Sequence, residues 1–371
     1  MKITEVAQEL MRFRTETGNT EQIMQAMSYI KNLMTLLGAK VDIFTKKDTA
    51  PVIFIRNRNT LDFDALVLGH IDVVPAADKM FSPVVKNGKL YGRGALDMKS
   101  FAAVALNSMQ YVLGNKLPLN FGIILSSDEE KGSKGTKAFL EKYNKIKAAV
   151  VLDNDVGGDI GKIIAKCKNP VFVKIIAHGK EAHGSRPWDG IDANDLMLTA
   201  LANIRKIYPA YSLTGKKPRN TWVDTLHFAK ITGGKVSNII SDYCETLCDF
   251  RLVETSSVDG LKKNLDKCMP EGVSYEIVSS SVPVVMDEKN PDILTYKKLA
   301  EEILGQKIKF EYEGGATDAR EFAVRGSTVI MHSGSGDGMH AAEEYVEIDS
   351  VEKLAEIQTR FLAKLALAKG K

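Results

Sequence analysis

The sequence predicts an α/β protein with a mostly parallel central sheet and an inserted α+β sandwich domain. Short apolar runs alternate with helical stretches over residues 20–153, and this alternation is typical of a parallel sheet covered by helices. The pattern becomes strand-rich after Pro170, and alternation resumes after Pro291. The chain has 371 residues, more than one hydrophobic core usually organises. We therefore predict an outer domain of residues 1–169 and 285–371, and an inserted domain of residues 170–284.

The elements of the outer domain follow from the spacing of its apolar residues. Ile23, Met27, Ile30 and Met34 recur at helical spacing, and the stretch stops at Gly38, a residue that commonly ends helices. The later apolar runs are short and bounded by polar or turn residues, as strands are. We predict helices over residues 20–37, 100–113, 133–143 and from 350 onward, and strands over residues 40–44, 52–56, 64–69, 121–127 and 148–153.

The inserted domain has a different order of elements. We predict strands over residues 171–178, 225–231, 245–252 and 273–278, and helices over residues 192–208 and 258–268. This order resembles a compact α+β sandwich.

Composition and charge exclude several classes of function. The net charge is only +3, with basic and acidic residues interleaved, which argues against nucleic-acid partners and a polybasic membrane surface. MKITEVAQEL has no apolar core of signal-peptide length, and no later run is long enough to cross a bilayer. We therefore expect a cytoplasmic protein. The four cysteines lack the spacing of a structural zinc site and are interpreted as buried reduced thiols.

Imidazole and carboxylate side chains collect near the ends of the predicted strands. They are His70 and Asp72 in HIDVVP, Asp97 in GRGALDMK, Glu129 and Glu130 in SSDEEKG, Asp153 and Asp155 in VLDND, and His340 in a glycine-rich loop. Sites in open α/β sheets form at the carboxyl ends of the strands, so we expect these side chains to converge. Several buried carboxylates without a cation would be costly. The set therefore indicates a metal centre.

The residue types suit zinc, which accepts neutral imidazole and carboxylate oxygen. Asp72 can accept a hydrogen bond from the second ring nitrogen of His70 and orient the ring. Glu129 and Glu130 diverge along the chain, so one can bind metal while the other acts as a base toward bound water. Each piece alone also has an ordinary interpretation, as a surface pair, a solvated acidic face or a turn. The order of the pieces carries the signal.

Five ordered segments resemble the successive motifs of one zinc metallopeptidase and deacylase family: HIDVVP, GRGALDMK, SSDEEKG, HGSRPWDGIDAN and MHAAEEYVEI. The family includes acetylornithine deacetylase, succinyl-diaminopimelate desuccinylase, glutamate carboxypeptidase and the zinc aminoacylases. The likeness runs in register from Thr15 to the C-terminal helix. It implies a zinc-exopeptidase-like catalytic domain with two zinc ions, for which cobalt or manganese would substitute, and an inserted lid or dimerisation domain.

The resemblance also implies a role for each candidate residue. The implied metal ligands are His70 and Asp153 on one zinc ion, Glu130 and His340 on the other, and Asp97 as the bridge between them. Asp155, two residues beyond Asp153, stays open as the alternative ligand. Glu129 would be the general base, and Asp72 would orient His70. The peptide bond after Asp97 is often cis in such enzymes.

The inserted domain matches the family at three further positions. His183 matches the histidine that reaches the substrate oxyanion, often in the active site of a partner subunit, and a homodimer through this domain is implied. Asn238 and Arg251 match residues near the substrate carboxylate, which arginine binds through two parallel hydrogen bonds. The ordinary alternatives are a satisfied histidine for His183 and a solvated or structural ion pair for Arg251.

The implied activity is hydrolysis of an amide bond beside a free carboxylate. The substrates would be N-acyl amino acids, as for a deacylase, or short peptides, as for a carboxypeptidase or dipeptidase, and no residue selects among them. Zinc-bound hydroxide would attack the carbonyl while Glu129 takes and returns the proton. The alternative from another class is a non-catalytic metal-binding or regulatory relative. Such a protein would be expected to lack Glu129 or a ligand, and none is missing.

Overall fold

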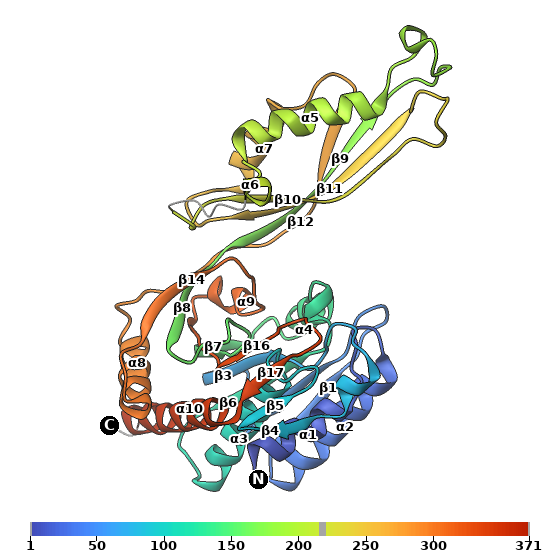
Figure 1. Cartoon of the computed structure of the whole chain (residues 1–371). Coiled ribbons are helices and arrows are strands. Elements are labelled where there is room, and N and C mark those ends of the chain that lie inside the picture. Colours follow the sequence, from blue (N-terminus) through green and yellow to red (C-terminus); the bar gives the residue numbers. More distant parts are fainter. Residues whose placement is uncertain (1, 215–219, 370–371) are drawn as a thin grey trace. The chain divides into compact units, whose positions relative to one another are not determined.

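The computed structural model describes residues 2–214 and 220–369, and the chain divides into two compact units (Figure 1). The first unit comprises Met1–Ala165, Met286–Glu313 and Thr317–Lys371. The second unit comprises Lys166–Val285 and Gly314–Ala316. Within the described ranges, no helix combines the length and the apolar character needed to cross a membrane.

A nine-stranded sheet is built from segments along most of the chain. Its order is β1 (Lys40–Phe44), β2 (Val52–Arg56), β6 (Phe121–Ser126), β3 (Asp62–His70), β7 (Lys147–Asp153), β15 (Thr328–Met331), β8 (Lys162–Cys167) and β13 (Val284–Val285), and β14 (Lys309–Glu313) also pairs with β8. The central strands β6, β3, β7 and β15 run parallel, and the flanking pairs are antiparallel. Every residue of β2 and β6 is buried, as expected for strands covered on both faces.

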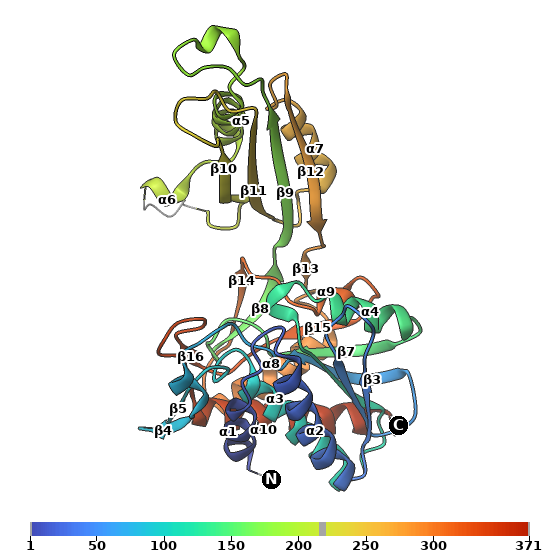
Figure 2. The same cartoon turned by 90° about the vertical axis from the view of Figure 1, so that its right-hand side faces the viewer.

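Helices cover both faces of this sheet (Figure 2). The larger set packs on one face: α1 (Ile3–Arg12), α2 (Thr20–Leu36), α3 (Lys99–Gly114), α8 (Pro291–Leu304) and α10 (Ile348–Lys369). The other face carries α4 (Lys134–Lys142) and α9 (Arg320–Ala323). Small residues such as Ala102 and Ala103 let α3 lie close to its neighbours. Asn19 caps α2 by accepting the N–H of Gln22, and Gly38 follows the helix with a φ of +89°.

A small antiparallel sheet brings together loops that are distant in sequence. Its order is β16 (Gly336–Asp337), β17 (Tyr345–Glu347), β5 (Lys89–Tyr91) and β4 (Val84–Lys86). The loop between β16 and β17 carries His340, and the segment after β5 leads to Asp97. Because β17 pairs with β5 through Tyr345 and Tyr91, the two loops are held next to each other.

The second unit is an antiparallel sheet with helices on one face. Its order is β10 (Thr225–Gly233), β11 (Tyr243–Leu252), β9 (Asn169–His178) and β12 (Val273–Ser280), and α5 (Ala193–Ile207) and α7 (Val258–Asp266) pack on it. Alternate residues of β9, including Val171, Val173 and Ile175, enter a separate core. The short helix α6 (Tyr211–Thr214) follows α5. Short 3₁₀ turns occur at Asp78–Phe81, Glu129–Lys131 and Pro187–Asp189.

The predicted fold class is confirmed. The central sheet is mostly parallel, and a separate antiparallel sheet with its two helices forms an α+β unit. Each predicted strand and helix is present, with ends that differ by a few residues. The prediction omitted α1, β8 and the short strands, and between Pro291 and the last helix it gave the alternation of helices and strands without its individual elements. All four cysteines are buried reduced thiols, as predicted. The role of the inserted segment as a lid or dimerisation domain stays a prediction.

Candidate metal centre

Parallel strands bring the first candidate ligands to one edge of the sheet. His70 is the last residue of β3 and pairs in register with Ser126, the last residue of β6. Glu129 and Glu130 follow β6 in a short 3₁₀ turn. Asp153 is the last residue of β7. Since parallel strands end at a common edge, these side chains start from neighbouring positions.

Five side chains form two groups that share Asp97. The first group is His70, Asp97 and Asp155, the second is Asp97, Glu130 and His340, and within each group one potential ligand atom per residue lies within 4.8 Å of the others. Asp97 Oδ1 is 3.0 Å from His70 Nε2, and its Oδ2 is 2.9 Å from His340 Nε2. The Asp97 carboxylate therefore lies between the two imidazoles, with one oxygen toward each.

The outer members of each group lie slightly farther away. Glu130 Oε1 is 3.2 Å from His340 Nε2, and Asp155 Oδ1 is 3.8 Å from His70 Nε2. His340 has a φ of +62°, which turns its loop at this position. Imidazole nitrogens and carboxylate oxygens at these separations are a donor set that suits zinc. The residues present therefore fit metal binding, with Asp97 common to both groups.

Asp72 connects three parts of the centre. His70 Nδ1 lies 3.0 Å from the backbone carbonyl oxygen of Asp72 and 3.4 Å from its Oδ1. The Asp72 carboxylate also accepts hydrogen bonds from the backbone N–H groups of Glu129 at 3.2 Å and Glu130 at 3.4 Å. Thr17 donates to Oδ2 of this carboxylate at 2.8 Å. The Asp72 side chain has no solvent exposure. Asp72 therefore fixes the His70 ring and the turn that carries both glutamates, as a buried carboxylate near a ligand histidine commonly does.

Asp153 and Asp155, the two alternative ligands, make different contacts. Asp153 Oδ2 accepts the Thr317 hydroxyl at 2.6 Å, and its Oδ1 accepts the Asp155 N–H at 3.0 Å. Its carboxylate therefore supports the loop, and Asp155 is the one that approaches His70. Burial raises the pKa of Asp153 to about 7.

The Asp97 loop is held by a buried ion pair that the sequence analysis missed. Glu344 is fully buried, and its Oε2 accepts a hydrogen bond from the guanidinium of Arg93 with an N···O distance of 2.6 Å. It also accepts the backbone N–H groups of Gly94, Leu96 and Asp97 at 3.1, 2.8 and 3.0 Å. The Asp97–Met98 peptide bond is cis, as the family resemblance implies. Arg93 and Glu344 lie 251 positions apart, so no local spacing reveals their partnership.

The carboxylates gathered in the centre shift the pKa values of its histidines and acids. Hydrogen bonds to Asp97 and Glu130 raise the pKa of His340 to about 10. Burial opposes ionisation of Asp97, but the two histidines outweigh it and hold its pKa well below its usual range. Burial, followed by the charge of Asp155, raises the pKa of Glu129 well above its ordinary value. Divalent cations would compensate this negative charge.

The sequence analysis also missed Lys99, a buried lysine two residues after Asp97. Burial lowers the pKa of Lys99 to about 7, and its Nζ donates to the Phe13 carbonyl at 2.7 Å. The LDMK segment gave no sign of this, because lysine is mostly exposed in proteins.

The remaining predicted residues lie in the second unit. His183 is exposed, and its Nδ1 lies 3.1 Å from the donating N–H of Ser185. Arg251 forms two hydrogen bonds to the Asp249 carboxylate, at 2.8 and 3.0 Å. Asn238 is exposed, and its carbonyl accepts the N–H of Gly184. The structural ion pair considered for Arg251 is therefore present, while the functional roles of these three residues stay predictions.

Comparison with known proteins gives consistent matches. The model of the family described as peptidase family M20/M25/M40 matches residues 66–364. A succinyl-diaminopimelate desuccinylase of Wolinella succinogenes is 28% identical over 306 residues, with 78% of this chain and 81% of the relative covered. An uncharacterised metallohydrolase of Methanocaldococcus jannaschii is 26% identical over 333 residues, with 78% of each chain covered.

Solved structures share the fold over the whole chain. An M20-family metallo-carboxypeptidase of Sulfolobus solfataricus matches with a TM-score of 0.80 and 18% identity, covering 99% of this chain and 100% of the other. The aminopeptidase PepT of Bacillus cereus matches with a TM-score of 0.78 and 18% identity, covering 98% of each chain. At this level of identity the likeness concerns the fold.

Proposed function

The chain belongs to the peptidase family M20/M25/M40 and is a metal-dependent hydrolase, and on this premise we propose that it is a two-zinc amidohydrolase that cleaves an amide bond beside a free carboxylate. The observation that carries the proposal is the pair of ligand groups that share Asp97. Glu129 immediately precedes the proposed ligand Glu130, and both lie in a turn whose backbone N–H groups donate to Asp72. A carboxylate shared by two ligand groups, with a second acid beside them, is an arrangement suited to two-metal hydrolysis.

We assign one metal position to His70 and Asp155, the other to Glu130 and His340, and the bridge to Asp97. The distances of 3.0 and 2.9 Å from Asp97 to the two imidazoles support this division. Bound zinc would polarise the substrate carbonyl and lower the pKa of a coordinated water to about 7. Cobalt and manganese are the expected substitutes.

Glu129 is the proposed general base. Its raised pKa suits a group that accepts a proton from the attacking water and passes it to the leaving nitrogen. The hydrogen bond from its own N–H to Asp72 fixes the backbone from which the side chain extends. Asp72 holds the His70 ring and the Glu129 turn at once, and acts as a positioning residue.

His183 is the proposed donor to the substrate oxyanion. The backbone N–H of Ser185 can only donate, so Nδ1 of His183 is the accepting nitrogen and Nε2 carries the proton. An imidazole whose Nε2 carries a proton can donate a hydrogen bond to negative charge on a carbonyl oxygen. Under this proposal His183 acts either in the active site of its own subunit or in that of a partner subunit.

The proposed substrates are N-acyl amino acids or short peptides. The names of the relatives, a desuccinylase and a metallo-carboxypeptidase, support both classes. Asn238 and Arg251 are proposed to contact the substrate carboxylate. Arg251 already donates two hydrogen bonds, from Nε and Nη2, to the carboxylate of Asp249. A substrate carboxylate would therefore have to displace Asp249 or bind Arg251 together with it.

A homodimer through the second unit is also proposed. The edge strand β10 exposes Ile231, and helix α5 exposes Leu198, with 56% and 63% of their surfaces accessible. Sedimentation of the metal-loaded chain should give twice the mass of the 40.8-kDa monomer. A monomer at all concentrations would contradict this part of the proposal.

Metal analysis combined with a substrate panel tests the main proposal. We expect two zinc ions per chain and hydrolysis of N-acyl amino acids or dipeptides that depends on their free carboxylate. Amidation of that carboxylate should abolish turnover. A chain that binds no metal and hydrolyses no member of the panel would favour the non-catalytic alternative.

The Asp153 and Asp155 assignments predict different results for matched substitutions. Asp155→Asn should lose one metal and lower kcat/KM by roughly 100-fold or more, because even residues that only support a ligand contribute 10- to 100-fold. Asp153→Asn should keep both metals, since an amide can still accept the Asp155 N–H and bond with Thr317. Metal content and kcat/KM of the two variants decide the assignment. The reverse pattern would restore Asp153 as the ligand.

The role of His183 predicts a loss of turnover without a loss of metal. Removing one oxyanion donor typically lowers kcat by about 100- to 1,000-fold, so His183→Ala should show this decrease with its metal content unchanged. His178→Ala is the control, because His178 is also an exposed histidine of the second unit. Equal kcat values for the two variants would contradict the proposed role of His183 as a donor to the substrate oxyanion.

A further inference from the structure

A chain of buried polar side chains runs through the core of the first unit to the residue before Asp155. Gln358 of α10 has no solvent exposure, and its Nε2 donates to Asn154 Oδ1 at 2.9 Å. Asn154 Nδ2 donates in turn to the carbonyl oxygen of His332 at 2.5 Å. On the other side, the Ser108 hydroxyl of α3 donates to Gln358 Oε1 at 3.3 Å. These hydrogen bonds join two helices to the segments that follow β7 and β15.

A largely apolar core surrounds the two amides. The buried neighbours of Gln358 on α10 include Leu354, Phe361 and Leu362. A buried amide without partners is costly, but the nitrogen and the oxygen of each amide both have partners here. Two apolar side chains of the same shape would fill this space with similar stability. The specific contribution of the amides is therefore a fixed direction for the Asn154 side chain.

His332, at the end of the chain of hydrogen bonds, is held by several contacts of its own. Its Nε2 donates to the Ile160 carbonyl at 2.8 Å, and its Nδ1 accepts the Tyr296 hydroxyl at 3.0 Å. Its backbone N–H donates to the carbonyl of Asp153 at 2.9 Å. Burial lowers the pKa of the imidazole to about 4, so the ring stays neutral and keeps both bonds at neutral pH. The His332 carbonyl, which can only accept, is therefore a fixed partner for Asn154.

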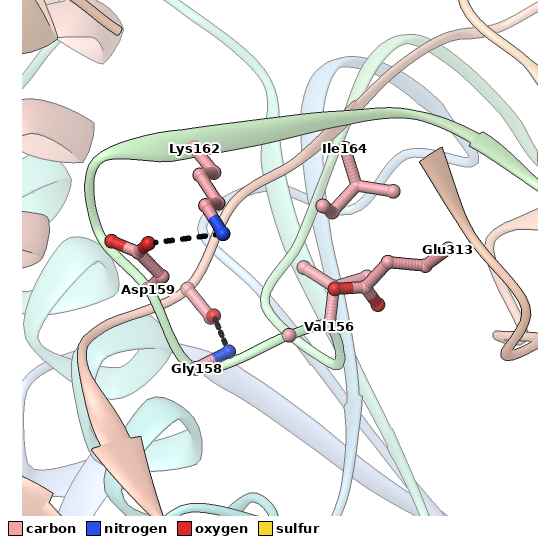
Figure 3. Close-up of a pocket in the computed structure, with 8 residues that line it drawn as sticks. Val156, Gly158, Asp159, Lys162, Ile164 and Glu313 are labelled. Carbon is pink, nitrogen blue, oxygen red and sulfur yellow. Dashed lines mark hydrogen bonds and ion pairs between the residues drawn. The ribbon is translucent and has the colours of Figure 1, made fainter. Parts of the chain in front are cut away.

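The loop is attached on both sides of Asp155. Before Asp155, the preceding residue is bound to His332 through its side chain. After Asp155, the Gly158 N–H donates to Ser333 Oγ at 3.1 Å, as Figure 3 shows for this part of the loop. Ser333 directly follows His332 in the sequence. Two consecutive residues after β15 thus hold the loop on either side of the proposed ligand.

We propose that Asn154 and Gln358 are positioning residues, which fix the loop so that Asp155 faces His70. This inference rests on the proposed function, under which Asp155 is a metal ligand. Asp155 Oδ1 lies 3.8 Å from His70 Nε2, and a metal ion between them requires that this separation be kept. Gln358 acts only through Asn154, whose backbone leads directly into Asp155.

Gln358→Met is expected to weaken one metal position and to spare the other. Methionine keeps the length of the side chain but cannot donate to Asn154. Partners that orient a metal ligand typically contribute about 10- to 100-fold to metal affinity, so one of the two zinc dissociation constants should rise by this factor. The other should stay unchanged, because its ligands Glu130 and His340 belong to the turn after β6 and to the loop between β16 and β17. Competition with a zinc chelator measures both constants, and kcat should recover at saturating zinc.

A double variant separates positioning from stability. Gln358→Met alone leaves a buried oxygen of Asn154 without its donor, which should lower the urea midpoint of the metal-free protein. Asn154→Leu combined with Gln358→Met replaces both amides with apolar side chains, so the midpoint should return toward the wild-type value while the zinc affinity stays low. Recovery of zinc affinity together with stability would overturn the inference, because a purely structural role predicts that result. This comparison holds even where Gln358→Met alone fails to fold.

A second comparison tests whether the effect passes through Asp155. In an Asp155→Asn background, Gln358→Met should have no further effect on zinc binding, and an additional loss at the remaining position would contradict the proposed role. Leu362→Met is the control, because it makes a volume-conserving change on the same buried face of α10 and should keep both zinc constants. A wild-type chain that binds no zinc contradicts the proposed function. A wild-type chain with two zinc ions whose affinities are unchanged in Gln358→Met contradicts the positioning role alone.

Discussion

Replacing Glu129 with glutamine is expected to leave both metal ions bound and to lower kcat by about 100- to 10,000-fold, the usual contribution of a positioned acid–base group. Glutamine keeps the size of the side chain and its backbone contact with Asp72, but it cannot accept the proton of the attacking water. KM should change little, because the substitution removes a group that acts on the reacting atoms. Metal analysis and steady-state kinetics on one preparation measure both effects.

Glu130→Gln is the matched comparison for this experiment. It makes the identical change one residue farther along the same turn, at a side chain 3.2 Å from His340. We expect this variant to lose one metal ion, so that its activity partly recovers at high zinc concentration. Full activity of Glu129→Gln, or recovery of that variant by added zinc, would contradict the division of roles between the two glutamates.

Replacing Glu344 with glutamine is expected to destabilise the first unit by about 3–5 kcal/mol, the usual effect of removing one partner of a buried ion pair. Arg93 would keep its charge with only 3% of its side chain exposed. The amide of glutamine would also face a backbone N–H that the carboxylate now accepts, and buried donors without acceptors are costly. Urea unfolding of the metal-free protein measures this loss.

Metal affinity gives a second measurement on the same variant. Glu344 accepts the N–H of Asp97 itself, so a shifted loop should weaken binding at both metal positions. Glu343→Gln is the control, because Glu343 precedes Glu344 and is exposed. Equal stability of the two variants would show that the buried pair is not needed to hold the Asp97 loop.

The fold was largely predictable because its central strands are short apolar runs with polar ends. Strands β2, β6 and β7 follow directly from VIFIR, FGIILSS and AAVVLD. The strand order was not predictable, because β15 lies between β7 and β8, which are consecutive in the chain. Such an insertion depends on long-range pairing that no local pattern records.

The candidate site was predictable where a side chain follows a strand and less so elsewhere. His70 and the two glutamates follow from their strand ends alone. The choice between Asp153 and Asp155 does not follow from the sequence, because it depends on the direction of each side chain, toward Thr317 for Asp153 and toward His70 for Asp155. The Arg93–Glu344 pair joins distant segments and has no periodic or motif signal.

The position of β15 and the His340 loop near the end of the chain has a consequence for biosynthesis. A ribosome that has completed the first 320 residues holds a nascent chain with a gap between β7 and β8, without His340 and without the buried partner of Arg93. Domains generally fold as units during translation, and this one cannot close until β15 and Glu344 have emerged. Capture of metal at the proposed centre is therefore expected only after His340 has emerged, and a product that stops before His340 would lack one of the proposed ligands.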